Sequence, residues 1–154
     1  ISSNQYGPEL PISRGDFAVM VYNAFDLSPS SSSRPFGDVS PNIYYAQAVN
    51  TLYSRGIVSG IGNGNYGPSY NVSRQDAVCM VQRAMRAVGM SANDASSVFL
   101  TPYSDSGSVS GYAQGAMANA VQQGYLPTSG GRLNPAQALT RMDMALIIHR
   151  VLTY

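Results

Sequence analysis

The sequence predicts an all-α fold, made of tandem helical repeats that are joined by long glycine-rich loops. The first observation behind this is a segment that occurs three times, each with a proline six residues before an arginine. These segments run from Tyr6 to Asp16, from Tyr66 to Asp76 and from Leu133 to Asp143. The second observation is that apolar residues follow each segment at the spacing of one helix face. Units repeated in this way are typical of chains that bury their faces against each other.

Three amphipathic helices are expected, one after each repeated segment. Their apolar residues fall at positions i, i+3, i+4 and i+7, which place them on one face of a helix. The three sets are Phe17, Met20, Val21 and Ala24; Ala77, Met80, Val81 and Ala84; and Met144, Ile147, Ile148 and Val151.

A second block occurs only twice and predicts two further helices. It opens with an aromatic-x-Asp turn, at Phe36–Asp38 and Tyr103–Asp105, and ends at Gly56 and Gly124, where glycine suits the end of a helix. We call residues 35–56 and 102–124 the first halves of repeats, and the three arginine-bearing segments with their helices the second halves.

This count predicts the domain organisation. The expected parts are the second half of one repeat (1–27), a Ser-rich linker (28–35), a full repeat (36–89), a linker (90–101) and a third, divergent repeat (102–154). Three second halves and two first halves suggest a piece of a longer protein, in which one first half is missing. The hypothesis is that the vacancy is filled by the lost segment, by self-association with a second copy, or is left as an open groove.

Each second-half helix begins with a capping box. Ser13 with Asp16, Ser73 with Asp76, and Thr140 with Asp143 have the spacing at which a hydroxyl accepts from a helix amide and a carboxylate reaches back. These six residues are therefore expected to cap helices.

The arginine after each cap calls for a partner. Arg14, Arg74 and Arg141 lie in a first helical turn, where the helix dipole disfavours a cation by about 0.3–1 kcal/mol. The partner is either a carboxylate, for which Asp38 and Asp105 are the candidates, or an anionic ligand that also uses the free helix amides.

Composition excludes several classes of function. A net charge of +1 with no cluster of cations argues against nucleic-acid binding. No segment resembles a signal peptide or a membrane span, and Cys79, the single cysteine, cannot form an intramolecular disulfide. His149 is the only histidine, so neither a metal site nor any other cofactor is expected. Few acids remain outside the caps, so a glycan-active enzyme is the weakest reading and no catalytic residue is assigned.

These motifs together resemble the S-layer homology family. The resemblance is carried best by Phe36–Val39, Gly56–Gly60, Tyr66–Pro68 and Val72–Asp76, and it covers nearly the whole chain. It implies a pseudo-threefold helical bundle with grooves between repeats. It also implies a secreted module at the bacterial cell surface, which holds its protein noncovalently to a secondary cell-wall polysaccharide bearing pyruvate.

The resemblance assigns the binding role to the three arginines, Arg14, Arg74 and Arg141. Asp38 and Asp105 are expected to orient the arginines or accept sugar hydroxyls, Tyr44 and Tyr112 to offer flat faces or pack helices, and Gly60 to line the ligand. A pyruvate ketal presents one carboxylate, which an arginine fork can grip with two bonds. A protein-protein docking module that uses the Tyr-rich grooves stays open as the alternative.

Overall fold

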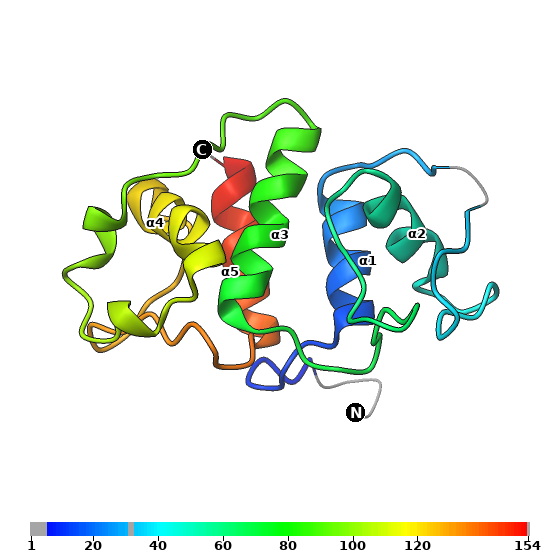
Figure 1. Cartoon of the computed structure of the whole chain (residues 1–154), viewed down its shortest axis with the longest axis horizontal. Coiled ribbons are helices and arrows are strands. Elements are labelled where there is room, and N and C mark those ends of the chain that lie inside the picture. Colours follow the sequence, from blue (N-terminus) through cyan, green and yellow to red (C-terminus); the bar gives the residue numbers. More distant parts are fainter. Residues whose placement is uncertain (1–5, 31–32, 154) are drawn as a thin grey trace. The chain divides into compact units, whose positions relative to one another are not determined.

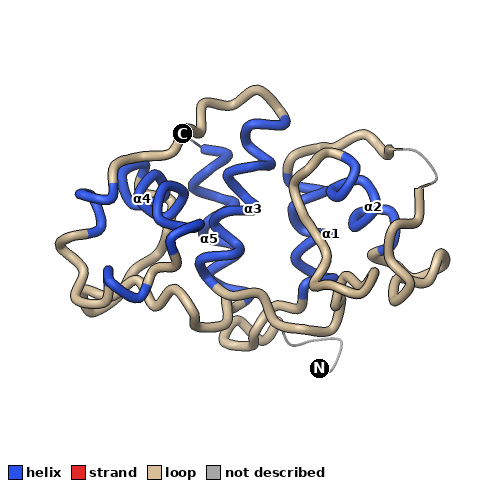
Figure 2. Tube along the Cα trace, in the orientation of Figure 1, coloured by secondary structure: helices blue, strands red, loops and turns tan. Residues whose placement is uncertain are grey.

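The computed structural model describes residues 6–30 and 33–153 and contains five α-helices (Figure 1). Residues 1–5, where no signal segment is predicted, lie outside the described residues, as do positions 31 and 32 of the Ser-rich linker and residue 154. The helices are α1 (Arg14–Ala24), α2 (Ala46–Ser54), α3 (Arg74–Ala87), α4 (Gln114–Gln123) and α5 (Arg141–Thr153). No strand occurs in the described ranges, and long loops join the helices (Figure 2), so the all-α prediction is confirmed.

Three short 3-10 helices lie between α3 and α4: η1 (Ser97–Leu100), η2 (Ser106–Ser108) and η3 (Gly111–Ala113). The first of them falls within residues 90–101, which are expected from the sequence to form a linker. It packs on α4 and buries Leu100, and the Ala95 amide donates to the Gly115 carbonyl at 3.1 Å. None of the described helices is both long enough and apolar enough to cross a membrane.

One compact unit comprises Ser13–Tyr70 and Met80–Ala92. Within it α1 and α2 pack side by side, which places Gly15 of α1 under the ring of Tyr45. The fully buried side chains there include Phe17, Val21, Val49, Leu52, Ile57 and Tyr66.

The other compact unit comprises Ile1–Ile12, Asn71–Cys79 and Asn93–Tyr154. It holds α4, α5 and the first turns of α3. Its core includes Ile12, Val72, Met117, Leu133, Leu139, Met144 and Ile147, each no more than 1% exposed.

A closed ring of backbone hydrogen bonds joins the three residues that precede the caps in this second unit. Ile12 donates to the carbonyl of Leu139 at 2.9 Å, and Leu139 donates to that of Val72 at 2.7 Å. Val72 completes the ring by donating to the carbonyl of Ile12 at 3.3 Å. Three segments far apart in sequence therefore meet through their main chains.

Candidate ligand site at the helix starts

The first-turn amides of the three second-half helices are all bonded. In α3, the amides of Arg74 and Gln75 donate to the carbonyls of Gln137 and Pro135, both at 2.9 Å, and that of Asp76 donates to the Ser73 hydroxyl at 3.2 Å.

The starts of α1 and α5 follow the same scheme. Their first two amides donate to backbone carbonyls at 2.8–3.0 Å, and the third donates to the hydroxyl of Ser13 or Thr140 at 3.1 Å. The expectation that a ligand uses free helix amides is therefore wrong, because loop carbonyls and cap hydroxyls already satisfy them.

Arg74 is the most enclosed of the three arginines, with 5% of its surface exposed. Its Nε donates to the carbonyl of Leu133 at 2.9 Å, its Nη2 donates to that of Pro127, and its Nη1 pairs with Oδ2 of Asp143 at 2.9 Å. These bonds use three of the five N–H groups of a guanidinium. The fork is thus held in one orientation before any ligand arrives.

Arg14 and Arg141 also bond to backbone carbonyls. The Nε of Arg14 donates to the carbonyl of Tyr66 and its Nη2 to that of Ser59, both at 2.9 Å. The Arg14 guanidinium lies 4.5 Å from the centroid of the Tyr66 ring, whose hydroxyl donates back to the Arg14 carbonyl at 3.0 Å. Burial raises the pKa of Tyr66 to about 12. Nη1 of Arg141 donates to the Tyr6 carbonyl at 3.3 Å.

Asp38 and Asp105 bond backbone amides and not the arginines, which corrects the expectation that they are the carboxylate partners of the arginines. Asp38 accepts from the amides of Tyr66 and Gly67, both at 2.8 Å. The Gly67 amide and the Tyr66 carbonyl belong to one peptide plane, and that carbonyl accepts from Arg14. Asp38 therefore accepts from the N–H of this peptide group while Arg14 donates to its carbonyl. Each hydrogen bond polarises the peptide group and so strengthens the other.

The same relay links Asp105 to Arg74 through the peptide of Leu133 and Asn134. Asp105 accepts from both of their amides at 2.8 Å, while the Leu133 carbonyl accepts from Arg74. Burial tends to raise the pKa of Asp105, but hydrogen bonds from the amides of Leu133, Asn134 and Asp105 itself, together with the charge of Arg132, leave the pKa below its usual value. Asn134 replaces the glycine of the other turns, and it adopts a φ of +49°, a conformation that asparagine tolerates.

The carboxylates of the capping boxes have further partners. The hydroxyl of Tyr44 donates to Oδ1 of Asp16, and that of Tyr112 donates to Oδ1 of Asp76 at 2.6 Å. The bond to Asp76 is the main reason why the pKa of Tyr112 rises to about 12. Both tyrosines are 67% exposed, and the Tyr44 ring also lies edge-on to that of Tyr45, with 5.0 Å between the ring centroids.

Gly60 has a packing reason to be glycine. A β-carbon there would lie 2.6 Å from the carbonyl oxygen of Asn65 and 2.8 Å from the ring of Phe36. The space that a side chain would need is therefore filled by the chain itself.

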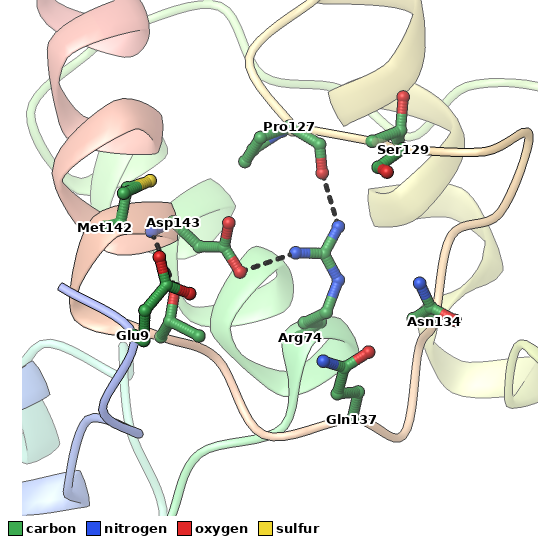
Figure 3. Close-up of a pocket in the computed structure, with 10 residues that line it drawn as sticks. Glu9, Arg74, Pro127, Ser129, Asn134, Gln137, Met142 and Asp143 are labelled. Atoms are coloured by element: carbon green, nitrogen blue, oxygen red, sulfur yellow. Dashed lines mark hydrogen bonds and ion pairs between the residues drawn. The ribbon is translucent and has the colours of Figure 1, made fainter.

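Arg74 and Asp143 lie together in a polar pocket of about 300 Å³ (Figure 3). The sequence motifs pointed to these two residues and to Thr140, but not to the rest of the lining. The other lining residues are Glu9, Pro127, Thr128, Ser129, Asn134, Gln137 and Met142. Glu9 comes one residue after Pro8, and Gln137 comes two residues after Pro135. Both therefore lie inside the repeated segments, and an alignment of these segments could have marked them as candidates for the site.

The charges in this pocket are one guanidinium and two carboxylates, those of Asp143 and Glu9. An incoming anion therefore meets a competitor, because Asp143 already holds one edge of Arg74. In the described part of the chain, no group of three or more His, Cys, Asp or Glu side chains is arranged to hold a metal ion.

Residues 35–78 and 102–145 match the protein family described as S-layer homology domain. Several relatives match over almost all of this chain, among them the following three. Amylopullulanase of Thermoanaerobacterium thermosulfurigenes is 26% identical over 153 residues, covering 99% of this chain and 8% of that enzyme. Endoglucanase of Bacillus sp. (strain KSM-635) is 30% identical over 157 residues, covering 98% and 16%. The surface-layer 125 kDa protein of Lysinibacillus sphaericus is 24% identical over 155 residues, covering 98% and 12%.

These relatives are far longer than the region that matches, since the chain spans only 8–16% of the length of these three. Two of them are named as enzymes and one as a surface-layer protein. The family match covers two repeats of one kind and not a catalytic domain.

Proposed function

The chain belongs to the S-layer homology domain family, whose members sit at the bacterial cell surface and anchor proteins to the cell wall, and we propose that it does so by binding an anionic glycan. The proposed ligand is a secondary cell-wall polysaccharide that carries ketal-linked pyruvate. The proposed sites are the grooves beside the helix starts, with Arg74 as the main contact.

The pocket around Arg74 is the observation that supports this proposal most. It combines the guanidinium of Arg74, which is held in one orientation, with hydroxyl and amide side chains. Its volume lies near the lower end of the range for small-molecule binding sites. A pyruvylated sugar offers one carboxylate on a neutral ring, which matches one cation among neutral polar groups. The sugar carboxylate would take the place of Asp143 on Nη1 of Arg74, and Ser129 and Gln137 would bond to hydroxyls.

The relay through the Leu133 peptide gives Asp105 a positioning role in this proposal. Asp105 holds the turn whose carbonyl orients Arg74, so it fixes the fork without touching the ligand. Asp38 has the same role toward Arg14. The exposed rings of Tyr44 and Tyr112 are suited to stacking against sugar rings.

We further propose that the repeats follow the boundaries expected from the sequence, with 36–89 and 102–154 as repeats and 1–27 as a second half. The closed ring of bonds among Ile12, Val72 and Leu139 supports a roughly threefold arrangement of these units. Each member precedes a cap, so each occupies the same position in its repeat.

The experiment is retention of the chain on purified, protein-free cell-wall polysaccharide before and after selective removal of the pyruvate ketals. We expect retention on the intact glycan and its loss after depyruvylation. Equal retention on both would refute the anionic ligand. No retention on either would favour the alternative, in which the surface docks protein.

A further inference from the structure

We propose that the pocket around Arg74 takes a sugar that carries a free amine as well as a carboxylate, and that Glu9 binds the ammonium group. This inference rests on the proposed function, because it names the class of glycan that the same site prefers. Glu9 is the residue that determines this specificity.

Glu9 is an acid whose carboxylate is available to a ligand. It is the single glutamate of the chain and is exposed, and its carboxylate makes no hydrogen bond or ion pair among the described residues. Most of the other acids are already bonded to amides, tyrosine hydroxyls or an arginine. They include Asp16, Asp38, Asp76, Asp105 and Asp143.

The exposure of Glu9 belongs to its position in the repeated segment. Glu9 directly follows the proline of the first segment, and Ser69 and Ala136 at the same position of the other two are exposed as well. Those two side chains carry no charge. Glu9 therefore brings to this pocket a carboxylate that neither equivalent position supplies.

The place of Glu9 suits a second contact to the ligand that Arg74 holds. Figure 3 shows Glu9 on the same side of the pocket as Asp143, across from the guanidinium of Arg74. Nη1 of Arg74 points to that side, where it pairs with Oδ2 of Asp143 at 2.9 Å. A ligand carboxylate that replaces Asp143 on Nη1 therefore lies toward Glu9, and an amine on the same sugar can face the Glu9 carboxylate.

The charge of the pocket favours a ligand that is neutral overall. The guanidinium of Arg74 and the carboxylates of Glu9 and Asp143 bring one positive and two negative charges to the lining. A sugar that carries only a carboxylate adds a third negative charge, and it separates Asp143 from its cation. A sugar with an ammonium as well leaves the net charge of the pocket unchanged, and the attraction between opposite charges then favours the contact with Glu9.

An ammonium group fits Glu9 better than a metal ion does. Calcium takes about six to eight oxygen ligands. Within the described ranges, no group of three or more His, Cys, Asp or Glu side chains could hold a metal ion. An ammonium group donates from N–H bonds and can pair with a single carboxylate while water accepts its other bonds.

The test measures the affinity of the chain for two synthetic probes by calorimetric titration at mildly acidic pH, where the amine is protonated. Both probes are the methyl glycoside of glucosamine with a pyruvate ketal, and in one of them the amine is acetylated. We expect the free amine to bind about three- to fivefold more tightly, as an exposed ion pair allows. Glu9→Gln keeps the shape of the side chain and should bind both probes with nearly equal affinity.

Two controls isolate the charge of Glu9. Asp26→Asn, at an exposed acid outside the lining of the pocket, should keep the preference for the free amine. Urea unfolding should give the same midpoint for Glu9→Gln and the unsubstituted chain, because the Glu9 carboxylate has no bond to lose among the described residues. Titrations in the presence of EDTA should give unchanged affinities.

Three results would overturn this inference and leave the proposed function standing, provided that the chain is retained on the intact polysaccharide. The first is an affinity for the acetylated probe that equals or exceeds that for the free amine, with absence of binding to either probe counted here. The second is a preference that persists in Glu9→Gln. The third is loss of the preference in EDTA, which would identify a metal ion as the partner of Glu9. Failure to retain the chain on the polysaccharide would refute the proposed function as well.

Discussion

Substitution of Arg74 and of Asp143 should change glycan affinity in opposite directions. Arg74→Ala removes the cation that the ligand carboxylate needs, and a hydrogen bond to a charged group contributes about 1.5–3 kcal/mol, so affinity should fall roughly 10- to 150-fold. Asp143→Asn keeps the shape but removes the charge that competes for Nη1 of Arg74. Affinity should then rise roughly fivefold, the equivalent of about 1 kcal/mol.

The free energy of unfolding should fall in both variants, whereas glycan affinity should fall in one and rise in the other. A change in affinity therefore cannot be explained by a change in stability. Arg74→Ala leaves a partly buried carboxylate and two carbonyls without their donor, a change that costs about 3–5 kcal/mol for a buried ion pair. Asp143→Asn should cost about 1–2 kcal/mol.

The assay is calorimetric titration with pyruvylated polysaccharide at fixed ionic strength, with urea unfolding to confirm that each variant is folded. Asp26→Asn is the matched control, because Asp26 is exposed and has a positive φ that asparagine accepts. Unchanged affinity in Arg74→Ala would refute the reasoning. The reasoning would also be refuted if both variants lost affinity in proportion to their loss of stability, because affinity would then follow folding and not the charge at Arg74.

Three further outcomes are expected. Asp105→Asn should cost about 1–3 kcal/mol at neutral pH in urea unfolding. Because the pKa of Asp105 is depressed, its contribution is present above the usual value of 3.8 and is lost as pH falls through the folded pKa, so the variant should show a shallower acid limb. The pKa of Tyr66 is raised from 10.0 to about 12, so its contribution to the free energy of unfolding is lost as pH rises from 10 toward 12. Tyr66→Phe should flatten this alkaline decline and lower the unfolding free energy at neutral pH by about 1 kcal/mol. Gly60→Ala should lower the unfolding free energy by about 1–3 kcal/mol, whereas Gly111→Ala, which meets open space, should change it by less than about 0.5 kcal/mol.

Local sequence patterns were sufficient to predict the helices. The offsets after Ser13, Ser73 and Thr140 predict α1, α3 and α5 because helix periodicity and capping depend on residues within one or two turns. Gly56 and Gly124 mark the ends of the other two helices, and both adopt the positive φ expected there.

The partners of the arginines could not be predicted in the same way. Asp105 was a reasonable candidate for Arg74 by charge, yet it acts through a peptide plane and the carboxylate that touches Arg74 belongs to Asp143. These contacts join residues about 30 to 70 positions apart, and no local periodicity encodes them. Glu9 lines the same pocket from a segment far from Arg74 in the sequence.

The closed ring of main-chain bonds has a consequence for how the chain folds. An open array of repeats can fold outward from any unit, because each unit touches only its neighbours. Here Ile12 bonds Leu139 across most of the chain, and Val72 bonds Ile12 in turn. The amide of Ile12 therefore finds its partner, the Leu139 carbonyl, only when the two ends of the chain have come together. The entropy of closing this long loop is lost before the packing contacts form. Folding of this unit is accordingly a late, cooperative event rather than a growth from one end.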